Sequence, residues 1–501
     1  MAARSARPPA PRFSAPKRKT TAMSESANER IADLVEITPI SEPRVADRKA
    51  RARDAILTGP IVATLMRLAL PTIAVLLAQT AVGVAETYYI GALGTEALAG
   101  VALVFPVYML MVTMSNGGLG SGVASALARA IGAGRQHDAD ALVLHTIVLA
   151  AIAGTVFTVG LLWSGPALYG ALGGNGPSLR AALSYSNTVF GGAVAIWIVN
   201  LLSAALRGAG NVRVPALVTL VGAAIMIPAS PALIFGFGPI PRLGVGGAGL
   251  AFVLYYVCAL IILLRYMASG RSGLKLRIAR LEWRLFADIL KVGIPTALNT
   301  VQTNLTVIIL TGAVGGLGVD AIAGYGIASR LDYVMIPILF GLSSAVLTMV
   351  GIAVGAGQAA RAHRIALIGA SVAGAFAEIV GLAVALAPTL WSGLFTGQAP
   401  VTIVATTYLT MVAPTYGFMA AGFVFAFAVQ GAGHALWPFL AYTTRTLLAA
   451  GGGVVAVQVF HAGMATLSAA VAVSYIVFAP ICGVPMLFRR LWRAPAKQDT
   501  A

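Results

Sequence analysis

Three carboxylates lie inside long apolar stretches of this 501-residue chain: Glu86, Asp332 and Glu378. A carboxylate placed in hydrocarbon is costly, so it persists where it faces a cavity, a partner or an ion path. Each of the three is therefore a candidate for ion coupling or substrate binding, and each could instead make a buried structural contact.

Glu86 is the sharpest of these candidates for cation coupling. Gln79 lies seven residues earlier on the same helical face, and Tyr89 lies about one turn later. Withdrawal from water favours the neutral form of a carboxyl group, which suits a group that loads and releases a proton. Chelation of a small cation by an oxygen-rich site is the other option. Pro71 begins the stretch and removes a helical hydrogen bond, which predicts a hinge there.

The other two acids have arginines nearby in sequence or in a neighbouring span. Asp332 follows Arg330 by two residues, a spacing at which side chains do not face one another on a helix. Glu378 is central in its span and could pair with Arg445. We expect Asp332 and Glu378 either to line the substrate cavity or to join a charge network with the two arginines.

Uncharged polar residues inside the spans complete the set of cavity candidates. Most such residues form hydrogen bonds between helices, and a minority line a path for substrate. The candidates are Asn116, Asn200, Gln302 and Asn304.

Motifs for other chemistry are absent from the sequence. It has no phosphate-binding Walker loop, no His/Cys cluster with metal spacing and no nucleophile elbow. We therefore expect no ATP use, no metal, no cofactor other than a transported H⁺ or Na⁺, and no enzymatic activity.

These residues are carried by a membrane-spanning scaffold. The chain is 58% hydrophobic and 10% charged, a composition typical of a polytopic membrane protein. Twelve apolar segments are long enough to span a bilayer as helices, at about 68–92, 97–127, 139–163, 180–206, 214–236, 245–267, 288–313, 318–350, 363–387, 400–430, 434–457 and 465–488.

The distribution of basic residues predicts the topology. The net charge is +17, and with the N-terminus inside, 30 of the 34 Lys and Arg residues fall on the cytoplasmic side. Both termini are therefore expected in the cytoplasm. This placement also accounts for the basic charge without a nucleic-acid partner.

The two halves of the chain repeat one another at an offset of about 224 residues. With six spans in each half, the repeats have the same orientation and are related by an axis along the membrane normal. We expect a disordered basic tail at 1–55, six-helix lobes at 56–270 and 271–490, and a second tail at 491–501. Matching positions include Pro71 and Pro295, Gly94 and Gly318, 132–134 and 355–357, and 208–210 and 431–433.

Several of these strings resemble the MATE (multidrug and toxic compound extrusion) family. They are Leu68-Ala-Leu-Pro71, Glu86-Thr-Tyr-Tyr-Ile-Gly91, Leu206-Arg-Gly-Ala-Gly210, Val292-Gly-Ile-Pro295 and Gln430-Gly-Ala-Gly433. The resemblance covers about 55–490. It implies a twelve-helix, two-lobe exporter with an acid of helix 1, here Glu86, involved in coupling.

The chain also departs from the family pattern. Many relatives have Asp-Pro in helix 5, where this chain has Ser230-Pro231, and one branch has a Glu in helix 7, where this chain has Gln302 and Asn304. The resemblance is therefore to the DinF-like branch. With those carboxylates missing, H⁺ is favoured over Na⁺ and more weight falls on Glu86.

The function expected from these features is cation-coupled efflux of cationic or amphipathic drug-like molecules by alternating access. The protein would act as a monomer in the plasma membrane, with the bilayer and a small-molecule substrate as its partners. Two alternatives stay open. A flippase for lipid-linked precursors would need a cationic groove, for which the sequence suggests only Arg330 and Arg445. A channel is disfavoured by the Gly/Pro-interrupted duplicated halves.

Overall fold

The computed structural model describes residues 53–239, 241–277, 280–488 and 492. The chain divides into two units, Met1–Asp47 and Arg48–Ala501, and all described residues belong to the second. Both predicted tails therefore lie almost entirely outside the described residues.

Within the described ranges the regular structure is helical. The first half contains α3 (Ile61–Gly91), α4 (Thr95–Thr113), π-helical η1 (Met114–Leu119), α5 (Gly120–Gly132), α6 (Gln136–Ala171), α7 (Gly176–Gly191), α8 (Ala193–Gly208), α9 (Arg213–Phe235) and α10 (Val245–Ala268).

The second half follows the same plan. Its elements are α11 (Trp283–Gly315), α12 (Val319–Gly355), α13 (Ala359–Leu386), α14 (Pro388–Ser392), α15 (Ala399–Val412), 3₁₀-helical η2 (Ala413–Thr415), α16 (Tyr416–Gly431), α17 (Leu436–Thr446), π-helical η3 (Leu447–Gly451), α18 (Gly452–Val454), π-helical η4 (Val455–Val459), α19 (Met464–Gly483) and 3₁₀-helical η5 (Val484–Leu487).

The prediction of twelve spans is confirmed, with one span bent. Eleven helical segments of the described chain are long and apolar enough to cross a membrane, and α7 with α8 makes the twelfth, bent by 51°. The bend falls at the adjacent glycines Gly191 and Gly192, which weaken the helix locally. The tenth span is interrupted at the equivalent place, where η2 separates α15 from α16.

Backbone geometry explains why the sequence repeat survives at glycines. Gly94 and Gly318 precede α4 and α12 with φ of 114° and 111°. Gly134 and Gly357 follow α5 and α12 with φ of 73° and 75°. Side chains rarely adopt such positive φ values, so both copies need glycine to make the same turns.

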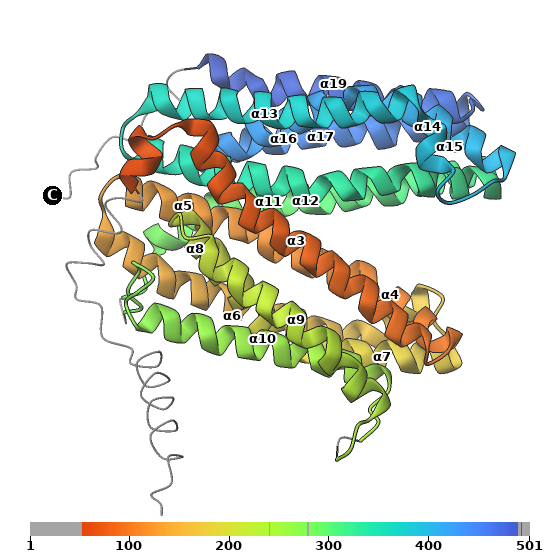
Figure 1. Ribbon diagram of the computed structural model, residues 1–501, viewed down its shortest axis with the longest axis horizontal. Coiled ribbons are helices and arrows are strands. Elements are labelled where there is room, and N and C mark those ends of the chain that lie inside the picture. The colour runs from red at the N-terminus through yellow and green to blue at the C-terminus, as the bar shows by residue number, and fades with distance from the viewer. Residues whose placement is uncertain (1–52, 240, 278–279, 489–491, 493–501) are drawn as a thin grey trace, which may run out of the picture. The chain divides into compact units, whose positions relative to one another are not determined.

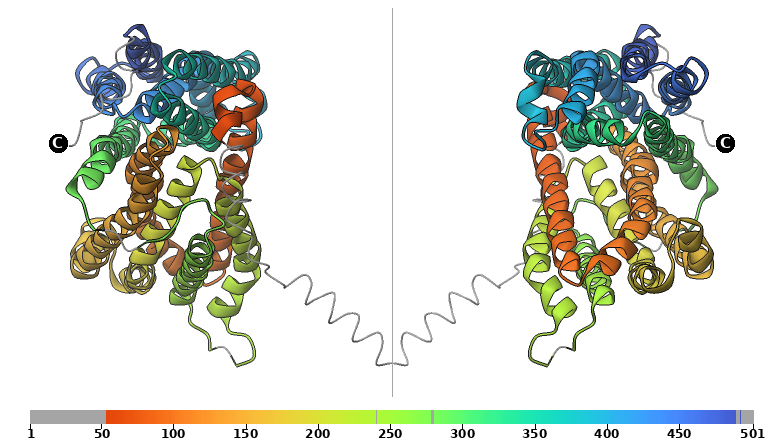
Figure 2. Two further views of the ribbon diagram at one scale, coloured as in Figure 1. Left: turned by 90° about the vertical axis from the view of Figure 1, so that its left-hand side faces the viewer. Right: turned by 90° about the vertical axis from the view of Figure 1, so that its right-hand side faces the viewer.

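Two large hydrophobic cores lie in the two groups of helices seen in Figures 1 and 2. Helices α3 and α11 contribute to both cores. The start of α3 packs in the core of the second half, and its end packs in the core of the first. The reverse holds for α11. Figure 1 shows α3 crossing diagonally from one group to the other. The residues concerned are Leu65, Leu68 and Ala69 against Ile90 in α3, and Leu285 and Ile289 against Leu310 and Val314 in α11.

The two halves meet most closely where α5 and α12 cross. A Cβ atom added to Gly132 would lie 2.8 Å from the carbonyl carbon of Ile352, and one added to Gly355 would lie 3.0 Å from that of Arg129. Gly132 and Gly355 are repeat equivalents, as are Arg129 and Ile352. The crossing is therefore pseudo-symmetric, and it places two backbones in contact because no side chain intervenes.

Candidate functional site

A pocket lies among α3, η1, α8, α9 and α10, with one wall formed by Phe340 of α12. Its cavity volume is about 30 Å³, so the pocket is narrow in this structure. Three residues predicted as coupling or cavity residues, Gln79, Asn116 and Asn200, line it together. The other lining residues are Thr72, Val75, Leu76, Val199, Ser203, Arg207, Val212, Pro215, Ala216, Thr219, Tyr255 and Tyr256.

A second, smaller pocket adjoins the first and reaches between the two halves. Both pockets share Asn116, Arg207 and Phe340, and the second adds Ser344 and Leu347 of α12. A molecule in these pockets would therefore contact helices of both halves, as a substrate moved by relative motion of the halves must do.

The π-helical segment η1 carries Asn116 to the pocket wall. The side-chain amide of Asn200 on α8 donates to the Ser115 hydroxyl at 2.8 Å, which ties η1 to α8. On its other side η1 packs against α11, where a Cβ on Gly118 would lie 2.9 Å from the Cα of Ala297. π-helical turns inside α-helices are frequent at functional sites.

Arg207 was not among the predicted site residues. The sequence places it in a loop together with Arg213, but it belongs to the last turn of α8. There it lies on the same helical face as Asn200 and Ser203, which precede it by seven and four residues. That spacing, in an apolar segment, is the signal by which the sequence could have placed Arg207 in the pocket.

Glu86 is buried inside the first half, with 6% of its surface exposed. The hydroxyl of Ser230 on α9 donates to its Oε1 at 3.1 Å. Tyr108 and Tyr185 lie within electrostatic range of the carboxylate. Of the ion pairs found among the described residues, none includes Glu86. The donor to this acid is therefore a neutral hydroxyl.

The predicted companions of Glu86 lie elsewhere on α3. Gln79 is on the pocket wall, two turns from Glu86, which is about 10 Å along the axis. Tyr89 packs its ring edge-on against Tyr88, with centroids 6.0 Å apart. Pro71 lies inside α3, which continues through it as one helix from Ile61 to Gly91.

Asp332 lies in the interior of the second half, surrounded by tyrosines. The hydroxyl of Tyr408 donates to Oδ2 at 3.2 Å, and that of Tyr416 donates to Oδ1. Arg445 is close enough for its charge to act on the carboxylate. The Arg445 guanidinium also lies 5.1 Å from the ring centre of Tyr475. These contacts place Asp332 in a local charge network and not in either pocket.

The remaining predicted residues have structural contacts. Glu378 accepts a hydrogen bond from the backbone N–H of Gly417 at 2.8 Å, which satisfies the first turn of α16 after the η2 break. It is thus Gly417, and not Arg445, that contacts Glu378. The other three are Arg330, over the Phe395 ring at 5.1 Å; Gln302, donating to Thr443 at 2.8 Å; and Asn304, donating to the Thr300 carbonyl at 2.8 Å.

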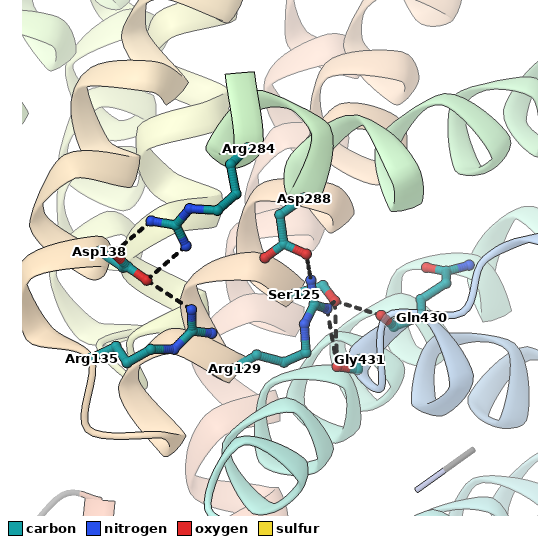
Figure 3. Close-up of polar contacts among 8 residues, drawn as sticks. All are labelled: Ser125, Arg129, Arg135, Asp138, Arg284, Asp288, Gln430 and Gly431. Carbon is teal, nitrogen blue, oxygen red and sulfur yellow. Dashed lines mark hydrogen bonds and ion pairs between the residues drawn. The ribbon is translucent and has the colours of Figure 1, made fainter. Parts of the chain in front are cut away.

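One end of the helices, called here the basic end, carries the loops at 133–135, 209–212, 356–358 and 432–435. Polar contacts link the two halves there (Figure 3). The Ser125 hydroxyl donates to the carbonyl of Gln430 at 2.5 Å, and the Arg129 guanidinium reaches the carbonyl of Gly431 at 3.5 Å. Arg129 also pairs with Asp288 at 2.7 Å. Together with the α5–α12 crossing, these contacts close the basic end.

The start of α11 is fixed beside this closure. Arg284 makes two hydrogen bonds to the Asp138 carboxylate, at 3.1 and 3.2 Å, and Arg135 pairs with the same carboxylate at 2.7 Å (Figure 3). His145 of α6 accepts the backbone N–H of Glu282 at 2.8 Å. The first turns of α11 are therefore held to α6, in agreement with their place in the core of the first half.

Comparisons with known proteins agree with this architecture. A model of the MatE family matches residues 71–232 and 295–455, one stretch in each half. The chain is 27% identical to the FAD transporter of Shewanella oneidensis over 75% of this chain and 84% of that protein. It is also 27% identical to the probable multidrug resistance protein NorM of Thermotoga maritima, over 75% of this chain and 81% of that protein.

Solved structures show the same fold. A MOP superfamily transporter from Pyrococcus furiosus superposes with a TM-score of 0.79 at 23% identity, over 87% of this chain and 97% of that one. A MATE structure in the bent conformation gives 0.79 at 24% identity, over 87% and 96%. The chain therefore belongs to the MatE family, and it is a membrane transporter rather than an enzyme.

Proposed function

We propose that the protein exports small organic molecules by alternating access and that inward movement of H⁺ at Glu86 drives the export. The observation that carries this proposal is the environment of Glu86. Its carboxylate is buried, and among the described residues one hydroxyl donates to it and no ion pair includes it. Taking up a proton there removes a buried charge without leaving an unbalanced cation.

The closed basic end supports alternating access. Its contacts between α5, α12 and α16 are short and confined to one end of the halves. Arginines lie in or beside these loops, which favours a cytoplasmic location for this end of a plasma-membrane protein; they are Arg129, Arg135, Arg207, Arg213, Arg361 and Arg364. The structure then corresponds to a state shut toward the cytoplasm. Proton binding at Glu86 would shift α3. Because the start of α3 packs with the second half, this shift would be passed on to the contacts that close the basic end.

The relatives support an organic substrate. Their names specify FAD in one case and multiple drugs in others, and FAD carries aromatic rings and phosphates. The pocket offers Tyr255, Tyr256 and Phe340 for such parts and amides for polar groups. We propose that the protein acts as a monomer and without ATP.

The test uses purified protein in liposomes with an imposed pH gradient and, separately, a Na⁺ gradient. Glu86→Gln keeps an acceptor for Ser230 and should insert normally, exchange substrate at equilibrium and lose export driven by the pH gradient. Glu86→Asp should retain part of that export. Glu96→Gln, at an exposed acid in the first turn of α4, is the matched control.

Export by Glu86→Gln at the wild-type rate under the pH gradient would refute the coupling role. Export driven by the Na⁺ gradient alone would replace H⁺ by Na⁺. Substrate flux without saturation or counterflow would favour a channel.

A further inference from the structure

The two adjoining pockets have an unexpected charge. Of the described residues that line them, Arg207 is the one charged side chain, and it borders both pockets. The polar residues around it are neutral amides and hydroxyls, among them Asn116, Asn200 and Ser121. A ligand in these pockets therefore meets one positive charge and no protein carboxylate in the described lining.

Arg207 also lacks a counter-ion in the described structure. Its Nε atom is buried and has no hydrogen-bond partner, and no ion pair of the described residues includes it. Arg129 by contrast pairs with Asp288, whereas Arg445, whose Nε is likewise buried without a hydrogen-bond partner, lies over the Tyr475 ring. A buried guanidinium N–H without a hydrogen-bond partner is costly unless another group satisfies it.

The position of Arg207 is fixed by both halves of the protein. Gly208 lets α8 approach α5 so closely that a Cβ there would lie 2.7 Å from the Cα of Ala124. From the other half, the Thr348 hydroxyl of α12 donates to the Arg207 carbonyl at 3.2 Å. The backbone at Arg207 is therefore held at the contact between the two halves.

We infer that Arg207, assisted by Asn116 and Asn200, binds an acidic group of the transported molecule, a phosphate or a carboxylate. The planar guanidinium presents a fork of donors that fits either oxyanion. The inference deepens the proposed function and rests on it, because it names the substrate class of the same pocket. It favours substrates with an acidic group over the cationic ones that the sequence suggested.

Binding of two fluorescent probes that differ by one phosphate tests the site. These are riboflavin 5′-phosphate and riboflavin, titrated into full-length protein in phosphatidylcholine nanodiscs without any gradient. We expect the wild type to prefer the phosphate ester. Arg207→Gln should weaken binding of the ester about tenfold or more and change binding of riboflavin less than about twofold.

Two variants serve as controls for charge and folding. Arg213→Gln removes an equal charge from an exposed position at the start of α9 and should bind the ester within about twofold of wild type. Arg207→Lys keeps a charge and should retain an intermediate preference for the ester, even if Arg207→Gln folds poorly. Equal binding of both probes by wild type, or unchanged ester binding by Arg207→Gln, would overturn the inference.

The source of the acidic group is distinguished by lipid composition. If a lipid headgroup occupies the site, nanodiscs with phosphatidylglycerol should weaken ester binding by wild type but not the residual binding by Arg207→Gln. If a solute is the ligand, the lipid should have no effect. Both results support an anion site. Glu86→Gln should keep the phosphate preference, so failure of this inference is separable from failure of proton coupling.

Discussion

Closure of the basic end should depend on two glycines, Gly132 and Gly355, that line neither pocket. At the α5–α12 crossing, a Cβ on Gly355 would lie 2.9 Å from the Ala133 nitrogen and 3.0 Å from the Arg129 carbonyl carbon. Carbon atoms normally pack about 3.5–4.0 Å apart. The change Gly355→Ala therefore requires the helices to separate by roughly 0.5–1 Å, and the obstacle is backbone, which cannot rotate away.

The free-energy cost falls on the closed state alone. Overpacking of this kind costs about 1–3 kcal/mol, whereas a state with α5 and α12 apart has room for the methyl group. A shift of about 2 kcal/mol is roughly 30-fold, so a basic end open in about 1% of molecules would become open in about a fifth. Gly132→Ala should have a similar effect, because Gly132 is the pseudo-symmetric partner with its Cβ 2.9 Å from the Ile352 Cα.

Spin labels on His137 and Ala360 can measure the opening, since these repeat-equivalent positions are exposed beside the basic-end loops. Cys258 and Cys482 are first replaced by alanine. Pulsed EPR should show a short distance in wild type and a new long-distance population in Gly355→Ala. The control is Gly326→Ala on the same helix, where a Cβ meets nothing within 4 Å. Equal distance distributions in Gly355→Ala and Gly326→Ala would refute the role of the crossing.

Three further predictions concern side chains whose contacts the structure defines. Arg129→Met removes the contact of the Arg129 guanidinium with the Gly431 carbonyl as well as its pair with Asp288. It should raise the ratio of open to closed molecules in the same EPR measurement by a factor of about 5–100; an unchanged ratio would contradict it. Tyr416→Phe removes a donor to Asp332 and should lower thermal stability by about 1–3 kcal/mol while pH-driven export persists; loss of coupling at unchanged stability would instead make Asp332 a coupling residue. Glu378→Ala removes the acceptor for the Gly417 N–H and should lower the free energy of unfolding by about 1 kcal/mol, whereas Glu378→Gln should not. Identical melting temperatures of the two variants would show that this hydrogen bond does not stabilise the start of α16.

Much of the scaffold was predictable because its determinants are local. Length and apolarity identify each span, and the repeat is visible because both copies need glycine at turns with positive φ, as at Gly94 and Gly318. The burial of Glu86 follows from its place in an apolar run. The bend between α7 and α8 depends on Gly192, whose effect on a helix varies with its packing, so the sequence suggested one continuous span.

Contacts between segments distant in the chain were not predictable. Glu378 could be paired with Arg445 on the basis of charge, but its partner is a backbone N–H freed by the η2 break, which carries no charge signal. Arg207 looked like a loop residue because topology rules count basic residues at span ends. Its place on the pocket wall depends on how far α8 extends and on Gly208, which brings α8 against α5.

The duplicated scaffold carries its two central acids differently, and this difference bears on which half is coupled to the ion. Asp332 is the repeat equivalent of Tyr108, and Tyr408 beside Asp332 is the equivalent of Tyr185 near Glu86. Both halves thus surround one buried carboxylate with tyrosines. In the second half Arg445 acts on the carboxylate, so protonation of Asp332 would leave a cation unbalanced. In the first half the hydrogen bond that the described residues give to the carboxylate comes from the neutral Ser230 hydroxyl, so protonation of Glu86 leaves no charge among these contacts. A carrier that passes through its transport cycle both with and without a bound proton needs a site whose charge disappears when the proton binds. The Glu86 site is of this kind and the Asp332 site is not, so we assign coupling to the first half.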